Sequence, residues 1–455
     1  MTKPYSQMAC YRKTKSKFVR KPMSNTPFKT LLLTSMVVCG SASAADCSDV
    51  AKVVAKKLQD SYVIEATATK LSQLLNSQDF LQRCRQQKSA ESIADFMTTE
   101  LNKIANDKHL SIYYDPQWVK ELKEYRASDQ DKAFADKRVL ETPTDNYGFK
   151  QVEMLEGNIG YVDIRSFADS HLGGATLESA MKFLQHADGI IIDLRNNFGG
   201  SPFMINTLAS YFFDLDTVHL STFESRESGQ LTQIQEWTSP FVPGPRFKDA
   251  PLYILTSKNS ASAAEAFSYA MKNLGRATLV GEVTAGAGHG RNTDIVNDDY
   301  ILSLPTTRGV DPRTNDSWEG KGVKPNIETP SDNALHVAYA DVLKTLISKG
   351  SHNSKLHQWA YPLAKAKSSQ YELNQDDITR LVGGYGERKV YQENGKLFYQ
   401  HADDRPLEIE LIDKETIVFK AFSSARLLAV YQNNKVVALK LLSADEDAQE
   451  FKRTL

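Results

Sequence analysis

Cysteine is scarce in this sequence, with four residues in a chain of 455. None of them has the spacing of a cysteine-based metal site, and the sequence predicts no metal and no cofactor. Two cysteines, Cys47 and Cys84, lie beyond the first 44 residues. In an oxidising compartment these two could form a disulfide that ties the start of the mature chain to a helix.

Acidic residues are missing from residues 1–44, which contain eight lysines and arginines. A short apolar stretch, TLLLTSMVVCG, follows this basic region and leads to small residues at Ala42 and Ala44. This order is typical of a secretory signal, and the apolar stretch is too short to cross a bilayer. We therefore expect an exported protein, periplasmic or secreted, with no stable membrane span after signal removal; an N-terminal anchor is the alternative. Because the basic region is long, translation begins at either Met1 or Met23.

An excess of positive charge is also absent. The chain has 55 lysines and arginines against 56 aspartates and glutamates, and removing the eight basic residues of the signal leaves 47 against 56, a net charge of about −9. An acidic surface argues against binding driven by nucleic-acid phosphates. The hydrophobic fraction of 41% and the charged fraction of 24% are those of a soluble globular protein. The sequence does not indicate an oligomeric state.

The spacing of apolar residues changes along the chain. The early part has helical spacing, whereas from residue 148 strands and helices alternate, which predicts a sheet with crossover helices. Short alternating runs separated by tight turns then predict an antiparallel β region at the end of the chain. The predicted organisation is a secretory signal (1–44), a helical N-terminal domain (45–125), a linker (126–147), an α/β core (148–350), a linker (351–370) and an antiparallel β module (371–455).

Ser262 lies where a predicted strand, PLYILTS, runs through a polar turn into a helix, ASAAEAFSYAMKN. One interpretation is structural, because Ser262 and Glu265 have the spacing of a helix capping box. The other is chemical. A helix N-terminus offers backbone N–H groups and a positive dipole end to a developing oxyanion, and the small residues around Ser262 leave room for a substrate carbonyl.

A nucleophilic serine needs a base, and the sequence leaves two histidines open. His109, in NDKHLSIYY, lies at the entry to a strand, and His289, in TAGAGHGRN, lies on a glycine-rich turn; the other seven histidines have no comparable setting. Spacing alone does not tell which of the two reaches Ser262. Each could equally be a surface or packed residue.

Two further features have both a structural and a chemical interpretation. Gly199 and Gly200 close the predicted strand GIIIDLRNN; they could be a plain strand-to-helix turn, or they could let backbone N–H groups approach a ligand. Glu319 lies beside Trp318 in a loop rich in glycine and proline, DSWEGKGVKPN. Such loops are usually only turns, but an acid there could orient a catalytic base.

Four segments in this order resemble the tail-specific (C-terminal processing) serine protease family: GNIGYVDIRSF, GIIIDLRNNFGGSP, LTSKNSASAAEAFSYAMKNLGRATLVGEVTAGAGHG and DSWEGKGVKPNIETP. The resemblance extends over residues 109–330 and implies an α/β core like that of crotonase and ClpP-like peptidases, with Ser262 as nucleophile. The processing branch of the family uses a lysine on the glycine turn, where this chain has Ala287, and it typically has a PDZ domain, which has no counterpart here. Both departures point to the branch that resembles tricorn protease and the repeats of interphotoreceptor retinoid-binding protein.

Within that branch the resemblance implies a site of serine, histidine and glutamate. Carried over to this chain, these are Ser262, His109 and Glu319, and the implied oxyanion donors are the backbone N–H groups of Ala263 and of Gly199 or Gly200. Tricorn protease has a serine beside its histidine, where this chain has Lys108.

The sequence thus predicts an exported serine endopeptidase that hydrolyses polypeptides through an acyl-enzyme on Ser262. His109 is the expected general base and Glu319 the orienting acid; His289 is an alternative base or a residue of the substrate cleft. The competing hypothesis is an inactive binding module of the same fold for a hydrophobic or peptide ligand.

Overall fold

The structure is a computed structural model that describes residues 47–127, 142–369, 371–443 and 447–454. The predicted secretory signal lies outside these residues, as does most of the predicted linker at 126–147. Within the described residues, no helix is both long enough and apolar enough to cross a membrane.

The chain forms two compact units. Of the described residues, the first contains 47–127, 224–232 and 289–308, and the second contains 142–223, 233–288, 309–369, 371–443 and 447–454. The first unit therefore combines the N-terminal helices with two segments from much later in the chain.

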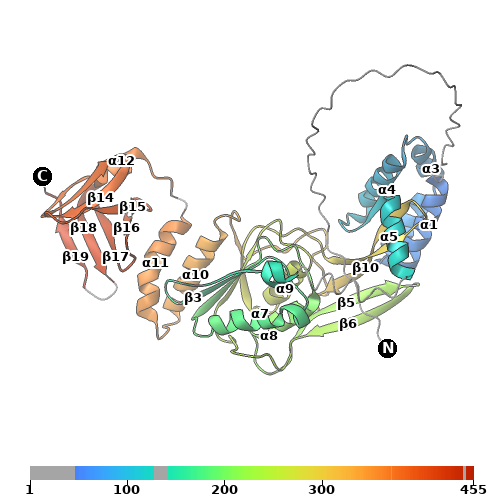
Figure 1. The fold of residues 1–455 in the computed structure, drawn as a ribbon, viewed down its shortest axis with the longest axis horizontal. Coiled ribbons are helices and arrows are strands. Elements are labelled where there is room, and N and C mark those ends of the chain that lie inside the picture. The colour runs from blue at the N-terminus through green and yellow to red at the C-terminus, as the bar shows by residue number, and fades with distance from the viewer. Residues whose placement is uncertain (1–46, 128–141, 370, 444–446, 455) are drawn as a thin grey trace, which may run out of the picture. The chain divides into compact units, whose positions relative to one another are not determined.

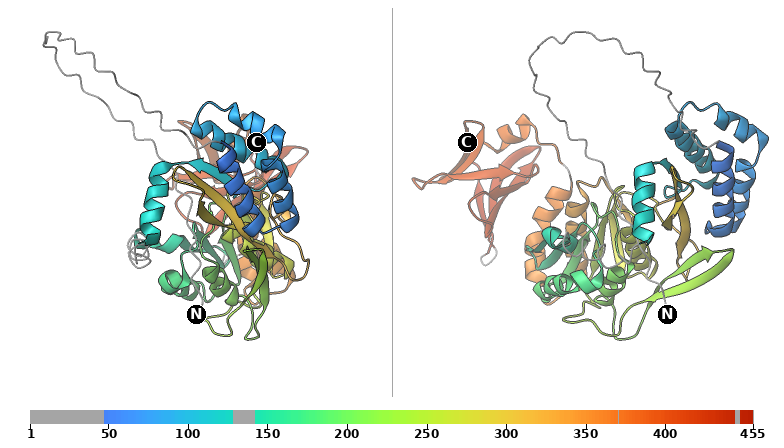
Figure 2. Two further views of the ribbon diagram at one scale, coloured as in Figure 1. Left: turned by 90° about the vertical axis from the view of Figure 1, so that its right-hand side faces the viewer. Right: turned by 45° about the vertical axis from the view of Figure 1, so that its right-hand side comes forward.

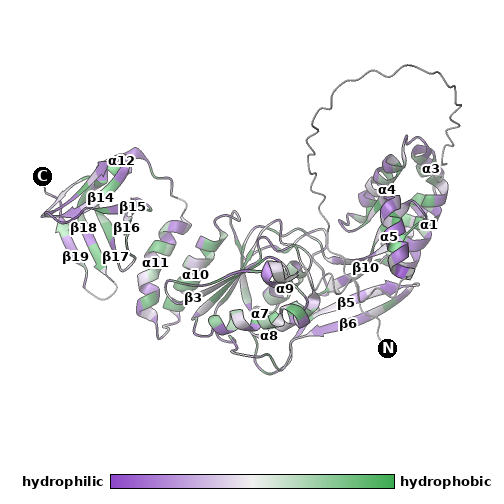
Figure 3. Cartoon of the chain, viewed as in Figure 1, coloured by the Kyte–Doolittle hydropathy of each residue, from purple (hydrophilic) through white to green (hydrophobic). Residues whose placement is uncertain are grey.

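Amphipathic helices build the core of the first unit, as the bands of hydrophobic and hydrophilic residues along them show in Figure 3. They are α1 (Cys47–Ser61), α2 (Glu65–Leu75), α3 (Gln78–Arg85), α4 (Ala90–Ala105) and α5 (Pro116–Ala127). Leu58, Phe80 and Met97 are completely buried between them. A disulfide joins Cys47 on α1 to Cys84 on α3, with the two Cα atoms 6.2 Å apart.

A five-stranded sheet has the order β1-β10-β5-β6, with β9 paired to β10. The strands are β1 (Ser111–Tyr114), β5 (His219–Glu227), β6 (Gln230–Trp237), β9 (His289–Ile295) and β10 (Tyr300–Val310). Antiparallel pairing places Ser111 opposite Ser303. This pairing brings the start of β1, and with it His109, to the same sheet as His289.

The second unit has a sheet of order β11-β8-β7-β4-β3-β2, of which β3 is labelled in Figure 1. Its strands are β2 (Phe149–Leu155), β3 (Ile159–Ile164), β4 (Gly189–Asp193), β7 (Leu252–Thr256), β8 (Ala277–Gly281) and β11 (Ile327–Glu328). Strand β2 is antiparallel to β3, whereas β3, β4, β7, β8 and β11 pair in parallel. This confirms the predicted sheet with crossover helices.

Helices cover both faces of this sheet (Figure 2). Ile190 and Ile192 of β4 pack in the core with α7 (Ser170–Phe183), α8 (Pro202–Ser210) and α9 (Ala263–Asn273). Ile191, between them in sequence, packs in the opposite core with α10 (Ala334–Ser348) and α11 (Ser354–Ser368). Successive side chains of a strand point to opposite faces, so a strand buried on both faces reads as a continuous apolar run.

Residues 351–370 differ from the predicted linker, because most of them form helix α11. Its buried positions include His357, Ala360 and Ala364. Alanine and histidine give only a weak apolar pattern, which explains why the sequence alone did not indicate a packed helix.

The C-terminal module confirms the predicted antiparallel β region. After helix α12 (Gln375–Leu381), its strands pair consecutively in the order of the chain. They are β12 (Gly383–Tyr385), β13 (Arg388–Glu393), β14 (Lys396–His401), β15 (Leu407–Leu411), β16 (Thr416–Phe419), β17 (Ala425–Gln432), β18 (Lys435–Ser443) and β19 (Gln449–Lys452). Ile417, Leu427 and Leu439 are fully buried in its core.

Candidate active site

Ser262 has a backbone conformation that is rare for a residue with a side chain. It lies between β7 and α9 with φ 54° and ψ −116°. The predicted capping box between Ser262 and Glu265 is present, but an N-cap residue normally has extended backbone angles, so Ser262 differs from an ordinary helix cap. A non-glycine residue at such angles costs about 1–3 kcal/mol and is typical of functional sites. The surrounding turn therefore holds Ser262 in a strained position.

Glu265, one turn into α9, holds Ser262 in place. This fully buried carboxylate accepts hydrogen bonds from the Ser262 N–H (2.9 Å), the Thr284 hydroxyl (2.5 Å), the Gly286 N–H (2.6 Å) and the Ala287 N–H (2.8 Å). Burial raises the pKa of the Glu265 carboxyl, against the opposing effect of these hydrogen bonds. The acid of the predicted capping box therefore joins the turn before α9 to the glycine turn after β8.

We expect Glu265→Gln to lower the free energy of unfolding by about 3 kcal/mol, because the amide nitrogen cannot accept and would leave buried N–H donors unpaired. Urea denaturation would measure this change. Glu178→Gln is the matched control, since Glu178 forms an ion pair with Lys182 (2.6 Å) at a partly exposed site and its loss should cost less than about 1 kcal/mol. Equal stability of the two variants would contradict a bridging role for Glu265.

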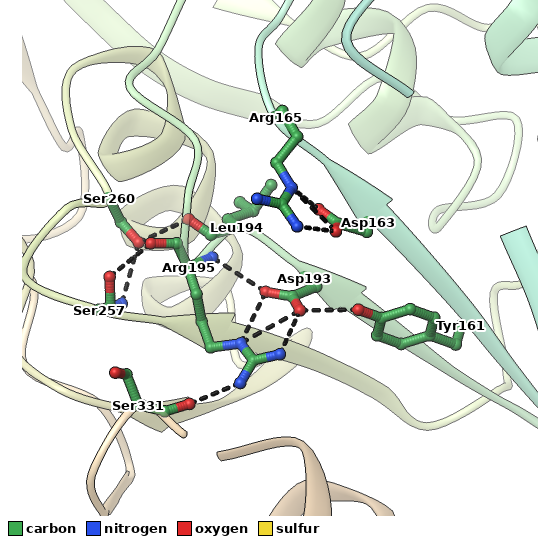
Figure 4. Close-up of polar contacts among 9 residues, drawn as sticks. All are labelled: Tyr161, Asp163, Arg165, Asp193, Leu194, Arg195, Ser257, Ser260 and Ser331. Carbon is green, nitrogen blue, oxygen red and sulfur yellow. Dashed lines mark hydrogen bonds and ion pairs between the residues drawn. The ribbon is translucent and has the colours of Figure 1, made fainter. Parts of the chain in front are cut away.

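The other two serines of the turn are structural. Ser257 donates its hydroxyl to the Arg195 carbonyl (2.5 Å), and Ser260 donates its hydroxyl to the Leu194 carbonyl (2.7 Å). The Ala261 N–H donates to the Asn197 carbonyl (3.0 Å). These bonds fasten the turn before α9 to the loop after β4, as Figure 4 shows for the two serines.

A buried ion pair fixes the start of that loop (Figure 4). The Asp193 carboxylate accepts from Arg195 (2.6 Å) and from the Tyr161 hydroxyl (2.8 Å). Arg195 also donates to the Ser331 carbonyl (2.6 Å). Burial and the negative charge of Asp193 raise the pKa of the Tyr161 phenol, so Tyr161 stays protonated as a donor. Asp193 and Arg195 are thus a structural pair.

Gly199 brings the loop after β4 against Ser262. A Cβ atom on Gly199 would lie 2.8 Å from Ser262 Cβ and 3.0 Å from the Ala263 nitrogen, and the residue has φ +108°. Only glycine allows this approach without strain. The Gly199 N–H donates to the Asn197 side chain (2.8 Å), whereas the Gly200 N–H has no acceptor among the described residues. The N–H groups of the two glycines therefore differ in their hydrogen-bond partners.

Both candidate histidines contact one buried carboxylate in the first unit. Asp107, 1% exposed, accepts from His289 Nδ1 (2.6 Å), from the Tyr62 hydroxyl (2.9 Å) and from the His109 backbone N–H (2.9 Å). Burial favours the neutral acid, but the hydrogen bonds, first of all that from His289, hold the pKa of Asp107 below its usual range. Asp107 therefore orients the His289 ring and holds the backbone of His109.

The side chains of His109 and His289 differ in their contact with Asp107. His289 is bonded through Nδ1, whereas His109 Nδ1 lies 3.9 Å from the carboxylate and has no hydrogen-bond partner among the described residues. Burial lowers the pKa of His109 to about 4, although Asp107 opposes this shift. His109 is therefore a neutral imidazole at physiological pH.

Glu319 lies in the second unit, on the loop between β10 and β11. Its Oε2 accepts a hydrogen bond from the Gly288 N–H (2.5 Å). Gly288 is glycine for a steric reason, since a Cβ there would lie 2.9 Å from the Glu319 nitrogen. Glu319 thus holds the end of the glycine turn, next in sequence to His289.

Residues 158–329 match the model of peptidase family S41. A CtpA-like serine protease of Staphylococcus saprophyticus is 31% identical over 199 residues, which cover 42% of this chain and 38% of that protein. A CtpA-like serine protease of Staphylococcus aureus is 30% identical over 194 residues, which cover 41% and 37%. The chain thus spans less than two fifths of the length of these relatives.

A solved structure, the photosystem II D1 C-terminal processing protease, has a TM-score of 0.42 and 15% identity, covering 63% of this chain and 94% of that one.

Proposed function

We propose that the chain is a serine-type peptidase that cleaves polypeptides with Ser262 as nucleophile, and the match of residues 158–329 to the model of peptidase family S41 supports this. The observation that carries this proposal is the strained backbone of Ser262 at the start of α9, with Gly199 packed against its Cβ. A structural cap needs neither the strain nor the close approach of a glycine.

The proposed reaction has two steps. Ser262 Oγ attacks the carbonyl carbon of the substrate and gives its proton to a base, which returns a proton to the leaving amine. The tetrahedral oxyanion accepts hydrogen bonds from the N–H groups of Ala263 and Gly200. We assign Gly199 a steric role, because its N–H is bonded to Asn197. Water then attacks the acyl-enzyme by the same route and releases the second product.

We propose His109 as the general base and Glu319 as the acid that orients His109. The neutral state of His109 and its unpartnered Nδ1 support this role, as does Ala287, which has no amine to act as a base. His289 is the alternative base, supported by its Nδ1 contact with Asp107 (2.6 Å), because an acid bonded to one ring nitrogen leaves the other to accept a proton.

Labelling with a fluorophosphonate probe, followed by mapping of the adduct by mass spectrometry, tests the nucleophile. We expect the adduct on Ser262, with no adduct in Ser262→Ala and normal labelling in Ser179→Ala, a serine on α7. Absence of any adduct on the folded protein would contradict the proposal.

The rate of the same labelling distinguishes the two histidines. If His109 is the base, the rate should rise as the pH increases through about 4, because protonated His109 cannot accept the serine proton. His109→Ala should lower the rate by about 100-fold or more, and His289→Ala should lower it less. A larger loss in His289→Ala than in His109→Ala would reverse the assignment.

We also propose that the protein is exported, to the periplasm or the medium. The Cys47–Cys84 disulfide supports this, since disulfides persist in oxidising compartments. N-terminal sequencing of the mature protein from a periplasmic or medium fraction tests it, and the expected start is near residue 45. The intact N-terminus in the cytoplasmic fraction would contradict export.

A further inference from the structure

A cavity of about 400 Å³ lies between helix α11 and strands β15–β17, apart from Ser262 and its surroundings. Its volume is in the range of small-molecule sites. Much of its wall is apolar and comes from Leu363, Ile412, Val418, Phe419 and Phe422. Such a wall suits the hydrocarbon part of a ligand.

Among the described residues, one cationic side chain of the cavity wall, Arg426, has a donor atom without a hydrogen-bond partner. Arg426 on β17 is 2% exposed and lines the cavity. Its guanidinium carbon lies 3.8 Å from the ring centroid of Trp359, and its Nη2 lies 3.8 Å from Glu156 Oε1. Its Nη1 is buried and has no hydrogen-bond partner among the described residues. Leaving such a charged donor unpaired costs free energy.

Glu156 does not fill this position. Its Oε1 accepts from Trp359 Nε1 (2.7 Å), and its backbone carbonyl accepts from the Tyr339 hydroxyl (2.6 Å). Burial lowers the pKa of Arg426, although the charge of Glu156 opposes this shift. Arg426 Nη1 is therefore a donor that is available to a ligand.

The remaining charges of the wall limit the charge of a ligand. Lys420 lies 3.6 Å from Glu410, so these two largely offset each other. Lys367 and Arg426 are then the cations that a ligand would meet. Glu156, 3.8 Å from Arg426, partly offsets the second of these charges, so a ligand with a single negative charge matches the balance better than a dianion such as a phosphate monoester.

We propose that this cavity binds a monocarboxylate with a short apolar tail, whose carboxylate accepts a hydrogen bond from Arg426 Nη1 and whose tail packs against Phe419 and Phe422. A free carboxylic acid and the C-terminal carboxylate of a peptide with an apolar last residue share this chemistry.

Isothermal titration calorimetry on the full chain tests the site, with octanoate as the probe and octanamide as its uncharged counterpart. We expect octanoate to bind at least about tenfold more tightly, which corresponds to one charge-assisted hydrogen bond. A tetrapeptide that ends in leucine, with a free or an amidated C-terminus, forms the second arm. Binding of either acid over its amide supports the site and identifies the source of the carboxylate. Equal binding of acid and amide, or no binding of either acid, overturns it.

Two variants test whether the acid binds in this cavity. Arg426→Gln removes the charge and should weaken binding of the acid by about tenfold or more. Ala425→Leu fills the cavity without touching the guanidinium and should have a similar effect; it keeps the test valid if Arg426→Gln fails to fold. Lys440→Gln, on the neighbouring strand and outside the wall, is the matched control. The proposal fails if a folded Ala425→Leu variant binds as the unmodified chain does. Fluorophosphonate labelling of Ser262 should be unchanged in all three, so this result is independent of the proposed peptidase activity.

Discussion

Replacing Ser262 with alanine is expected to lower the rate of polypeptide hydrolysis by about 10⁴-fold or more, the scale seen when the nucleophile of a serine protease is removed. The fold should survive, because the hydrogen bond from residue 262 to Glu265 comes from the backbone N–H. Fluorescein-labelled casein, unfolded before use, provides the assay, and urea denaturation provides the stability. Ser179→Ala is the control and should retain full activity.

A second variant separates the chemical role of Ser262 from its strain. Ser262→Gly should be as inactive as Ser262→Ala but about 1 kcal/mol more stable, since glycine tolerates φ 54° and ψ −116°. Full activity in either variant would exclude Ser262 as the nucleophile. Equal stability of the two would show that the backbone of residue 262 is not strained in solution.

Gly199→Ala is expected to reduce fluorophosphonate labelling of Ser262 by about 100-fold and to lower the free energy of unfolding by about 2–3 kcal/mol. The added methyl would lie 2.8 Å from Ser262 Cβ and 3.0 Å from both the Ala261 carbonyl oxygen and the Ala263 nitrogen. Either the serine or the loop must shift, and both shifts disturb the proposed oxyanion site.

Gly275→Ala is the control for the backbone effect of that substitution. Gly275 also has a positive φ, +65°, but a Cβ atom there would meet nothing within 4 Å. Its replacement should cost about 1 kcal/mol and leave labelling unchanged. If Gly199→Ala behaves in the same way, the close approach between the loop and Ser262 has no part in reactivity.

The sequence predicted the α/β core because its signals are local. GIIIDLRNN begins with a short apolar run, and the structure buries its first five residues as β4 on both faces. The turn into α9 was predicted from three serines followed by a helical pattern, and that helix begins at Ala263. Strand alternation and turn residues likewise predicted the C-terminal β module.

The contacts that hold the candidate site could not be predicted in this way. Asp107 meets His289 across 182 positions of sequence, and Glu265 meets Ala287 across 22. Such pairs depend on strand order and loop geometry, not on periodicity. For Asp107, the only local signal was an acid two residues before His109, and for Glu265 the capping-box pattern suggested a role within one helix.

The Glu265 carboxylate also links the local unfolding of the turn before α9 to that of the glycine turn after β8. This buried carboxylate accepts hydrogen bonds from three backbone N–H groups, those of Ser262, Gly286 and Ala287. Solvent reaches these amides only when that group is exposed, so in heavy water they should exchange together, with one shared opening free energy. The turn that presents Ser262 therefore loosens only in concert with the glycine turn, and a substitution in either segment alters the exchange of both.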